Sequence, residues 1–530
     1  METIILNGVD LTLDQVVLIA RGSHDGSGHH YPLVKLSDSS VKTLKEFRQA
    51  LEVRIAAKDI IYGVNTGCGS KKGVIIPPSD IIAYQARYIP AHCVATGVPL
   101  PEEVVRLAMV LRVNSFAKGN SGIRLATCQQ ILDFYNARAI PVIPSQGSVG
   151  SSGDLCLLAH MAAALIGRKE QLVTLGREIM TAPEALGEMN LEPLVLEAKE
   201  AMGITNGSTF TLAMCLLAVY DAERLLRYSN QAFALSFEAI RGEKAALDLR
   251  IHKARNHQGA VRIAEEVLAL THGSKRTTDK ARAIKLPDET HKKYHEGVPT
   301  PRVQDAYSFR AYATVAGSSL ETIEFAKDIF IREINASTDN PLLFKKDDGT
   351  FETLSGGNFH GEPLAQAADY LKIALQSIAG ISDRRFYALL SSAFSYGLPD
   401  DLAGSELDTG LMILQYTTAS LVSQNKVLCY PSAVDSIPTS AGQEDYVSMG
   451  TISALNLRQV LENTFTVIAA ELMAGARGIN FTESHFPNGL GAGSRSIFRL
   501  VNSIVPFEKD DCFWSLHLEN MKNALKSNSL

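Results

Sequence analysis

The chain has 530 residues, of which 46% are hydrophobic and 20% are charged, and its formal net charge is −6. This composition is typical of a globular protein with a large apolar core, and the mildly acidic charge argues against binding to nucleic acid or acidic membranes through a basic surface. No apolar run approaches the roughly 18 residues that a membrane span needs, and the N-terminus lacks the basic start of a signal peptide.

In chain order, the first 60 residues mix short strand-like runs such as "TIILNG" with helical stretches. Residues 61–80 contain four glycines and two prolines, which predicts a loop. Helical spacing resumes at Ile81 and continues until a second loop, "PVIPSQGSVGSSGD". We therefore expect a smaller mixed domain at residues 1–200, which carries both loops.

Beyond about residue 200 the pattern is overwhelmingly helical. Apolar residues such as Leu212, Leu216 and Leu225 recur near helical spacing, and residues 455–476 follow the same pattern. The sequence thus predicts a mainly α fold, with an elongated helical-bundle domain at residues 201–530. Several of these helices are too apolar for one exposed face, which favours burial in an oligomer.

The cysteines and histidines limit the chemistry. Seven cysteines are scattered and never form a CxxC pair, so we expect a cytoplasmic protein without disulfides. The groups "HDGSGHH" and "HKKYH" (His291 and His295) contain metal-ligand types but no closing third ligand. We therefore expect no metal site.

The stretch "QGSVGSSGDLCLLAHMAAALIG" places a cluster of glycines and serines at the mouth of an apolar helix. Its simplest interpretation is a flexible turn followed by a helix from Leu155 to Ile166, with Asp154 as N-cap and Gly167 at the C-terminal end.

A chemical interpretation also fits this stretch. Glycine nitrogen is the least hindered backbone nucleophile, and a sharp turn can bring the nitrogen of Gly153 onto the carbonyl carbon of Ser151. Cyclisation, followed by loss of the Ser152 hydroxyl as water, leaves a ring with an exocyclic methylene. That group is a strong electrophile, and the positive end of the following helix raises its electrophilicity further.

"GSVGSSGDL" resembles the signature of the aromatic amino acid ammonia-lyase and aminomutase family. In that family an Ala-Ser-Gly triad cyclises to 4-methylidene-imidazol-5-one (MIO). The resemblance extends from Tyr62 to Met449 through several motifs in the family's order. It implies a helical architecture like that of fumarase and aspartase, an MIO formed from Ser151, Ser152 and Gly153, and a homotetramer whose active sites draw loops from three subunits.

The motif "YGVNTGCG" carries the base that the resemblance implies. Read alone, Tyr62 is a packing residue on a glycine-rich loop. By resemblance it removes the β-proton of the substrate, as a phenolate whose pKa neighbours lower from its usual value near 10. Two departures from the family pattern are Ser151 in place of alanine and Cys68 in place of an aromatic residue.

Further motifs supply residues for the amino acid itself. By resemblance Asn206, which could also be a helix N-cap, contacts the electrophile, Tyr307 lies near it, and Arg310 holds the substrate carboxylate with bidentate hydrogen bonds. The same resemblance brings in four residues beside the ring or the substrate: Gln304, Asn340, Phe359 and Gln443.

Four positions bear on the substrate's side chain. By resemblance His92 faces that side chain, and Met412 and Glu444 match residues of histidine-acting members, in which the glutamate pairs with an imidazole N–H. Tyr416 instead matches a tyrosine that some tyrosine aminomutases place on the phenol. One such hydrogen-bonding residue can decide specificity.

We expect a lyase that converts L-histidine, a small-molecule amino acid, to trans-urocanate and ammonia. A tyrosine ammonia-lyase or tyrosine 2,3-aminomutase is the alternative; the mutase differs in returning ammonia to the β-carbon. A third hypothesis, from another class, is a catalytically silent helical scaffold in which the Ser151 variant of the triad never cyclises.

Overall fold

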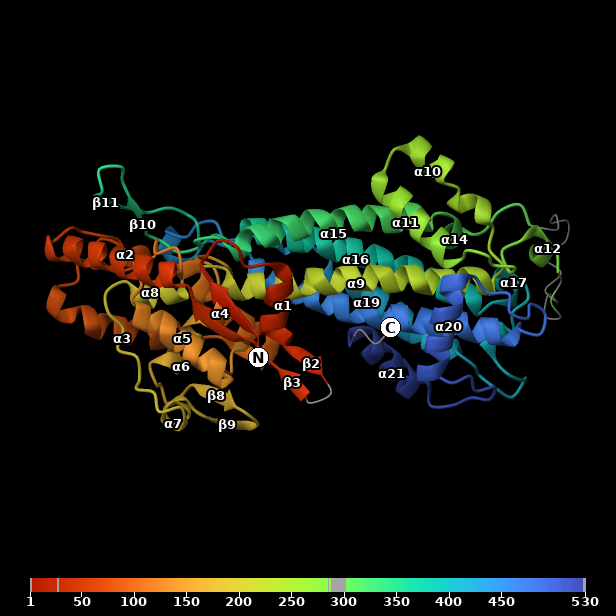
Figure 1. The fold of residues 1–530 in the computed structure, drawn as a ribbon, viewed down its shortest axis with the longest axis horizontal. Coiled ribbons are helices and arrows are strands. Elements are labelled where there is room, and N and C mark those ends of the chain that lie inside the picture. Colours follow the sequence, from red (N-terminus) through yellow and green to blue (C-terminus); the bar gives the residue numbers. More distant parts are fainter. Residues whose placement is uncertain (1, 26–27, 285, 287–301, 528–530) are drawn as a thin grey trace. The chain divides into compact units, whose positions relative to one another are not determined.

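The computed structural model describes residues 2–25, 28–284, 286 and 302–527, and these are mainly helical, with a few short strands (Figure 1). The predicted mainly α fold is confirmed. His291 and His295 lie outside the described residues. No helix within the described part is both long and apolar enough to cross a bilayer.

The described chain forms two compact units. The first contains residues 1–220, 327–369 and 431–455, and the second contains residues 221–326, 370–430 and 456–530. This division differs from the expected single boundary at residue 200. The reason is that four long helices each contribute residues to both units: α9 (Thr209–Ala239), α15 (Tyr312–Ile334), α16 (Glu362–Leu389) and α19 (Gly450–Phe481).

The first unit combines helices with small separate sheets. Its helices are α1 (Leu13–Arg21), α2 (Asp38–Ala56), α3 (Ile81–His92), α4 (Glu102–Phe116), α5 (Leu125–Ala137), α6 (Leu155–Leu165), α7 (Ala182–Glu188) and α8 (Glu200–Thr205). Its strands are β1 (Thr3–Leu6), β2 (Ser23–Asp25), β3 (Gly28–His30), β4 (Leu33–Leu36), β5 (Thr96–Pro99), β6 (Ala139–Pro141), β7 (Pro144–Gln146), β8 (Leu172–Leu175), β9 (Glu178–Thr181), β10 (Leu342–Lys345) and β11 (Phe351–Leu354).

These strands pair locally. β1 pairs with β4 in parallel, and the pairs β2–β3, β5–β7 and β10–β11 are antiparallel, as is the sheet β6–β8–β9. The expected strand "TIILNG" is therefore confirmed as β1. The first expected loop, residues 61–80, lies between α2 and α3 and contains two short 3-10 turns, Gly69–Lys71 and Pro78–Asp80. The second, "PVIPSQGSVGSSGD", differs from the expectation because it contains the strand β7, and its main loop part lies after β7.

Helix ends in this unit follow from the sequence. Thr12 and Gln15 form a capping box at the start of α1, which satisfies two backbone donors that the helix leaves unpaired.

Helix α4 is enclosed on all sides, because every residue from Val104 to Phe116 is buried. Its polar side chains therefore need partners inside the unit.

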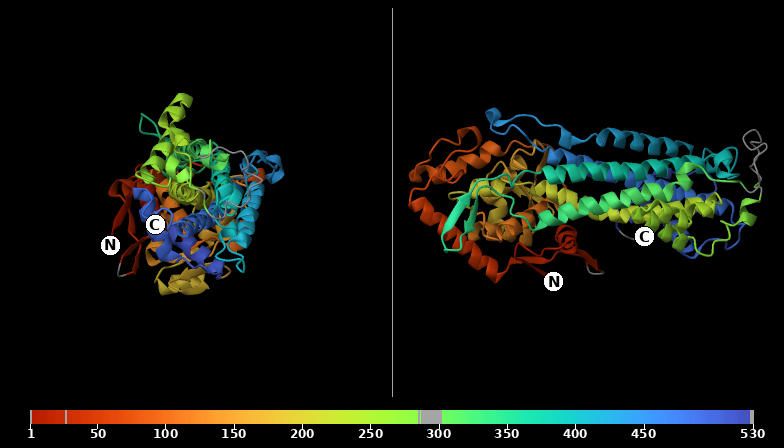
Figure 2. Two further views of the ribbon diagram at one scale, coloured as in Figure 1. Left: turned by 90° about the vertical axis from the view of Figure 1, so that its right-hand side faces the viewer. Right: turned by 90° about the horizontal axis from the view of Figure 1, so that it is seen from above.

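The second unit is a helical bundle. Besides its parts of α9, α15, α16 and α19, it contains α10 (Leu249–Arg255), α11 (Gln258–Leu270), α12 (Asp279–Arg282), α14 (Tyr307–Arg310), α17 (Ser392–Ser395), α18 (Met412–Leu428), α20 (Ala492–Ile504) and α21 (Trp514–Lys526). The second-unit segments of the four long helices run side by side in the two lengthwise views, Figure 1 and the right-hand view of Figure 2.

A buried ion pair fastens these helices together. The carboxylate of Glu471 on α19 accepts two hydrogen bonds from Arg385 on α16, at 2.5 and 2.7 Å, and both side chains are fully buried. The same carboxylate accepts hydroxyl hydrogen bonds from Ser236 on α9 at 2.8 Å and from Ser382 on α16 at 2.5 Å. One carboxylate thus joins three helices of the bundle.

Glu471→Ala should lower the free energy of unfolding of the second unit by about 3–5 kcal/mol, because it leaves the Arg385 guanidinium buried without its counter-charge. The matched control is Glu324→Ala, which breaks an exposed ion pair to Arg262 of 2.6 Å and should cost at most about 1 kcal/mol. Trp514, the only tryptophan, reports urea unfolding of this unit by fluorescence. Equal midpoint shifts for the two variants would contradict the assignment.

Candidate active site

A cavity of about 670 Å³ in the first unit brings together segments that are far apart in the sequence. Its lining includes eight of the residues singled out by the sequence: Tyr62, His92, Ser152, Asn206, Asn340, Phe359, Gln443 and Glu444. The walls come from the loop after α2, from α3, from the start of α6, from the end of α8 and from two loops later in the chain.

The glycine-serine loop is clamped on both sides of Gly153. The N–H of Gly207 donates to the carbonyl oxygen of Ser152 at 2.9 Å, and the N–H of Asp154 donates to the carbonyl oxygen of Gly207 at 2.9 Å. A Cβ on residue 153 would lie 2.0 Å from the carbonyl carbon of Gly207, and residue 153 has a φ of +81°. Only glycine fits this position.

A second set of contacts holds the start of the same loop. The N–H of Met449 donates to the carbonyl oxygen of Val149 at 3.0 Å, and the hydroxyl oxygens of Thr451 and Ser148 lie within hydrogen-bond distance of each other at 2.9 Å. Ser151 and Gly153 pair with each other in an isolated bridge, which marks a sharp turn. The loop is therefore held in one conformation with Ser152 at the cavity wall.

Asp154 departs from its expected role. It stands at the N-cap position of α6, but its side chain makes no capping hydrogen bond there. Its buried carboxylate instead accepts hydrogen bonds from the N–H of Thr211 at 2.9 Å and from the hydroxyls of Thr211 and Thr451 at 2.7 Å each. It thereby caps α9 and fastens the loop to two other helices. Gly167 does end α6 in the left-handed region, with a φ of +68°, as expected.

Tyr62 lies on the first glycine-rich loop, where its hydroxyl oxygen accepts a hydrogen bond from the N–H of Gly69 at 3.1 Å. The expectation that neighbours lower its pKa is wrong for the single chain. Burial raises the pKa of Tyr62 above 10, the Gly69 hydrogen bond opposes this rise, and the nearby Cys68 and Glu444 add to it.

Helix α3 presents three rings to the cavity at four-residue intervals: Tyr84, Tyr88 and His92. His92 stacks on Tyr88 with ring centroids 3.9 Å apart and an interplanar angle of 16°. Its Nδ1–H donates to the carbonyl oxygen of Tyr88 at 2.7 Å, since a carbonyl can only accept. In the neutral ring this leaves Nε2 as a hydrogen-bond acceptor.

The loop that carries Gln443 and Glu444 packs against the loop that follows Tyr62. The hydroxyl of Ser440 accepts a hydrogen bond from the N–H of Ser70 at 3.2 Å, and Lys72 donates to the side-chain oxygen of Gln443. The Glu444 carboxylate accepts from the Thr439 hydroxyl at 3.2 Å. Tyr62 and this carboxylate therefore belong to one packed pair of loops.

Asn206 and Asn340 contact each other at another part of the cavity wall. The side-chain amide of Asn206 donates to the carbonyl oxygen of Asn340 at 3.2 Å, and the Asn340 side chain accepts from the N–H of Gly356 at 2.7 Å. The carbonyl of Phe359 accepts from the Ser208 hydroxyl at 3.2 Å. The motifs that contain Asn206, Asn340 and Phe359 are therefore neighbours in the structure.

The remaining expected site residues lie in the second unit, and none is among the described residues that line this cavity: Gln304, Tyr307, Arg310, Met412 and Tyr416. Tyr307 and Tyr416 expose 74% and 60% of their surface. The Nε–H of Arg310 donates to the carbonyl of Asp305 at 3.3 Å, and the Arg310 guanidinium lies 4.6 Å from the Tyr307 ring centroid.

The sequence did not single out two tyrosines of the wall, Tyr84 and Tyr88. The hydroxyl of Tyr84 donates to the sulfur of Cys68 at 3.4 Å, so the unusual cysteine of the loop contacts this helix. Cations also line the cavity, namely Lys71, Lys72 and Arg87. The four-residue spacing of Tyr84, Tyr88 and His92 could have predicted that all three rings lie on one face of a helix.

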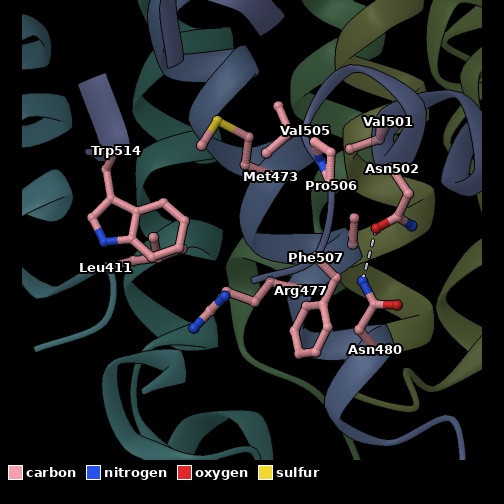
Figure 3. Close-up of a pocket in the computed structure, with 11 residues that line it drawn as sticks. Leu411, Met473, Arg477, Asn480, Val501, Asn502, Val505, Pro506, Phe507 and Trp514 are labelled. Carbon is pink, nitrogen blue, oxygen red and sulfur yellow. Dashed lines mark hydrogen bonds between the residues drawn. The ribbon is translucent and has the colours of Figure 1, made fainter. Parts of the chain in front are cut away.

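A second described cavity, in the other unit, is too small for a substrate. It holds about 20 Å³, and Figure 3 shows Arg477, Phe507 and Trp514 at its wall. Arg477 donates to the carbonyl oxygens of Leu402 at 2.7 Å and Lys509 at 3.0 Å. This cavity is therefore part of the packing around a buried guanidinium.

Comparisons with known proteins agree with these motifs. A family model described as aromatic amino acid lyase matches residues 11–503. A histidine ammonia-lyase of Alkaliphilus oremlandii (strain OhILAs) is 37% identical over 531 residues, covering 100% of this chain and 98% of that protein.

Two solved structures match over nearly the whole chain. The histidine ammonia-lyase of Trypanosoma cruzi has a TM-score of 0.86 and 35% identity, and the match covers 100% of this chain and 94% of that one. A tyrosine aminomutase of Streptomyces globisporus has a TM-score of 0.88 and 29% identity, with 99% and 97% covered.

Gly153→Ala should disrupt the clamp on Gly207, because the new methyl group has no space. We expect a loss of more than about 3 kcal/mol in the free energy of unfolding, since both overpacking and a positive φ oppose alanine. Gly176→Ala is the control: its φ is +66° but nothing lies within 4 Å of the added Cβ, so only the roughly 1–2 kcal/mol of backbone strain applies. Circular dichroism melts measure both; similar melting temperatures would refute the steric clamp.

Proposed function

The chain belongs to the aromatic amino acid lyase family, and from this membership we propose that it eliminates ammonia from L-histidine and releases trans-urocanate. The observation that carries the proposal is the cavity that gathers Tyr62, His92, Ser152, Asn206 and Glu444 from distant segments. The relative of 37% identity over the full length, a histidine ammonia-lyase, supports the choice of substrate.

The residues at 151–153 fit the MIO group that family membership implies. Ring closure requires an unhindered backbone nitrogen at residue 153, and the space beside Gly153 admits no side chain. Ser151, Ser152 and Gly153 would supply its atoms. Once formed, this group supplies the electrophilic carbon that turns the substrate's amino group into a leaving group.

Tyr62 acts as the general base. Its phenolate oxygen takes the β-proton of the substrate while the bond from the α-carbon to nitrogen breaks and ammonia leaves. The N–H of Gly69 donates to this oxygen at 3.1 Å and so stabilises its charged form.

His92 and Glu444 select the side chain. The Nδ1–H of His92 is engaged by the carbonyl oxygen of Tyr88, so Nε2 is the ring nitrogen left to contact the substrate. The neutral imidazole ring of the substrate has one N–H, which can be donated to Nε2 of His92 or to the carboxylate of Glu444. A site that hydrogen-bonds its substrate strongly rejects analogues that lack the donor.

The substrate carboxylate requires a cation with two parallel donors, and Arg310 is the residue expected to supply it. Family membership supports a homotetramer in which other subunits supply Arg310 and Tyr307 to each active site. All seven cysteines are free, which supports a reducing compartment, the cytoplasm.

Parallel ultraviolet assays with L-histidine and L-tyrosine test the substrate. We expect absorbance of trans-urocanate with L-histidine and little product with L-tyrosine. Product from tyrosine alone, as a cinnamate or a β-amino acid, would replace the proposal with a tyrosine ammonia-lyase or 2,3-aminomutase. The intact mass of the wild type should be lower than the sequence mass by two water molecules. An unmodified, inactive protein would indicate a silent scaffold.

Tyr62→Phe should lower kcat by about 10²–10⁴-fold with a small change in KM, because a general base contributes about that much. Tyr84→Phe, on the same wall, should keep kcat within about tenfold of the wild type, because its hydroxyl contacts only Cys68 among the described partners. Equal kcat values for the two variants would contradict the role of Tyr62.

The pH dependence follows from the raised pKa of Tyr62. Below that pKa the phenolate fraction falls about tenfold for each pH unit, so kcat/KM should rise with pH through neutrality into the alkaline range. A wild-type profile that falls with pH between neutrality and mildly alkaline conditions would show that a different group limits the reaction.

A further inference from the structure

Arg112 is a fully buried cation next to Gly207, whose backbone hydrogen bonds to Ser152 and Asp154 hold the glycine-serine loop. It lies on α4, where it is 0% exposed, and its Nη1–H donates to the carbonyl oxygen of Asn206 at 2.5 Å and to the hydroxyl of Thr209 at 3.2 Å. Its Nε and Nη2 have no hydrogen-bond partner among the described residues. A buried guanidinium so incompletely satisfied is costly, which calls for a reason beyond packing.

The guanidinium occupies the inside of the turn that Gly207 makes. Gly207 has a φ of +119°, and a Cβ on it would lie 2.6 Å from Nη1 of Arg112 and 2.7 Å from the carbonyl oxygen of Thr338. Arg112 therefore fixes the direction in which the Asn206–Gly207 peptide points.

That peptide is also the one that holds the glycine-serine loop. Its carbonyl oxygen, on Asn206, accepts from Arg112, and its N–H, on Gly207, donates to the carbonyl oxygen of Ser152 at 2.9 Å. Hydrogen bonds in such a chain polarise one another, so a cation on the carbonyl strengthens the N–H as a donor. The charge of Arg112 thus acts on the Ser152 carbonyl through one peptide group.

The cation persists at neutral pH in spite of its burial. Burial lowers the pKa of Arg112 to about 10, and the nearby Asp339 and Asp154 oppose this decrease. Asp339 is itself engaged by Lys199, at 2.8 Å between two fully buried side chains. Arg112 is consequently left without a direct ion pair among the described residues. Its guanidinium lies 4.4 Å from the ring centroid of Phe116, and the Asn206 carbonyl is the backbone group that it contacts.

We propose that Arg112 is a positioning residue that holds and polarises the Asn206–Gly207 peptide against the carbonyl oxygen of Ser152, and that cyclisation of residues 151–153 depends on it. The inference rests on the proposed function. During cyclisation the Gly153 nitrogen bonds to the Ser151 carbonyl carbon, whose oxygen leaves as water together with the N–H hydrogens of Ser152 and Gly153. The Ser152 hydroxyl and α-proton leave as a second water. Polarising the Ser152 carbonyl acidifies that α-proton.

Intact mass spectrometry of purified full-length variants tests this inference. We expect Arg112→Met to fold, as judged by circular dichroism, but to keep the unmodified sequence mass. The matched control is Arg106→Met on the same helix, whose buried guanidinium donates to the carbonyl of Ala20 and to Glu102. That variant should lose two water molecules like the wild type. Full modification of Arg112→Met would overturn the proposal.

Two further variants keep the test informative if Arg112→Met fails to fold. Arg112→Lys retains a cation that can reach the Asn206 carbonyl, whereas Arg112→Gln retains a donor without charge. We expect a larger modified fraction for Lys than for Gln, by at least about threefold, because charge-assisted hydrogen bonds are roughly twice as strong as neutral ones. Equal modified fractions would overturn the role of the charge.

The wild type separates this inference from the proposed function. An unmodified wild type overturns both. A modified wild type that deaminates L-histidine, together with fully modified Arg112 variants, overturns only the role of Arg112.

Discussion

The pairing of the Ser152–Asp154 backbone with Gly207 is the constraint on which the rest of the cavity depends. Two hydrogen bonds of 2.9 Å fix it, and no side chain fits between the two glycines. From this pairing, Asp154 reaches Thr211 and Thr451, and Arg112 reaches the Asn206–Gly207 peptide from behind. Polar groups that each need a buried partner thus converge on one short segment of main chain.

Within one chain, the surroundings of Tyr62 favour its neutral form over the phenolate that the proposed reaction needs. Burial, Cys68 and Glu444 favour the protonated form of Tyr62, and only the N–H of Gly69 opposes them. The arginine expected beside the substrate carboxylate, Arg310, belongs to the second unit, whereas the cavity lies in the first. In the proposed tetramer its positive charge would favour the phenolate, which makes assembly a condition for a working base as well as for substrate binding.

Apolar periodicity predicted the mainly α fold, and the family motifs predicted eight of the residues that line the cavity. The Gly153 nitrogen must be free of steric hindrance for ring closure. Tyr62, His92, Asn206 and Glu444, each from a different motif, all line the cavity. The sequence could not predict that Asp154 caps α9 rather than its own helix, since that depends on Thr211 being nearby in space. Nor could it show that Tyr62 is buried, and burial is the main reason that its pKa is raised where the sequence predicted a decrease. The two compact units also differ from the expected division at residue 200, because four long helices each contribute residues to both units.

The clamp also explains which departure from the family's triad the loop tolerates. Residue 153 is enclosed by main chain, and residue 152 must carry a hydroxyl for the proposed chemistry, but residue 151 contributes only its carbonyl and its side chain is half-buried. Serine in place of alanine at position 151 therefore leaves the backbone geometry intact. Anyone redesigning this loop has one adjustable position in the triad, and natural variation among relatives should concentrate there.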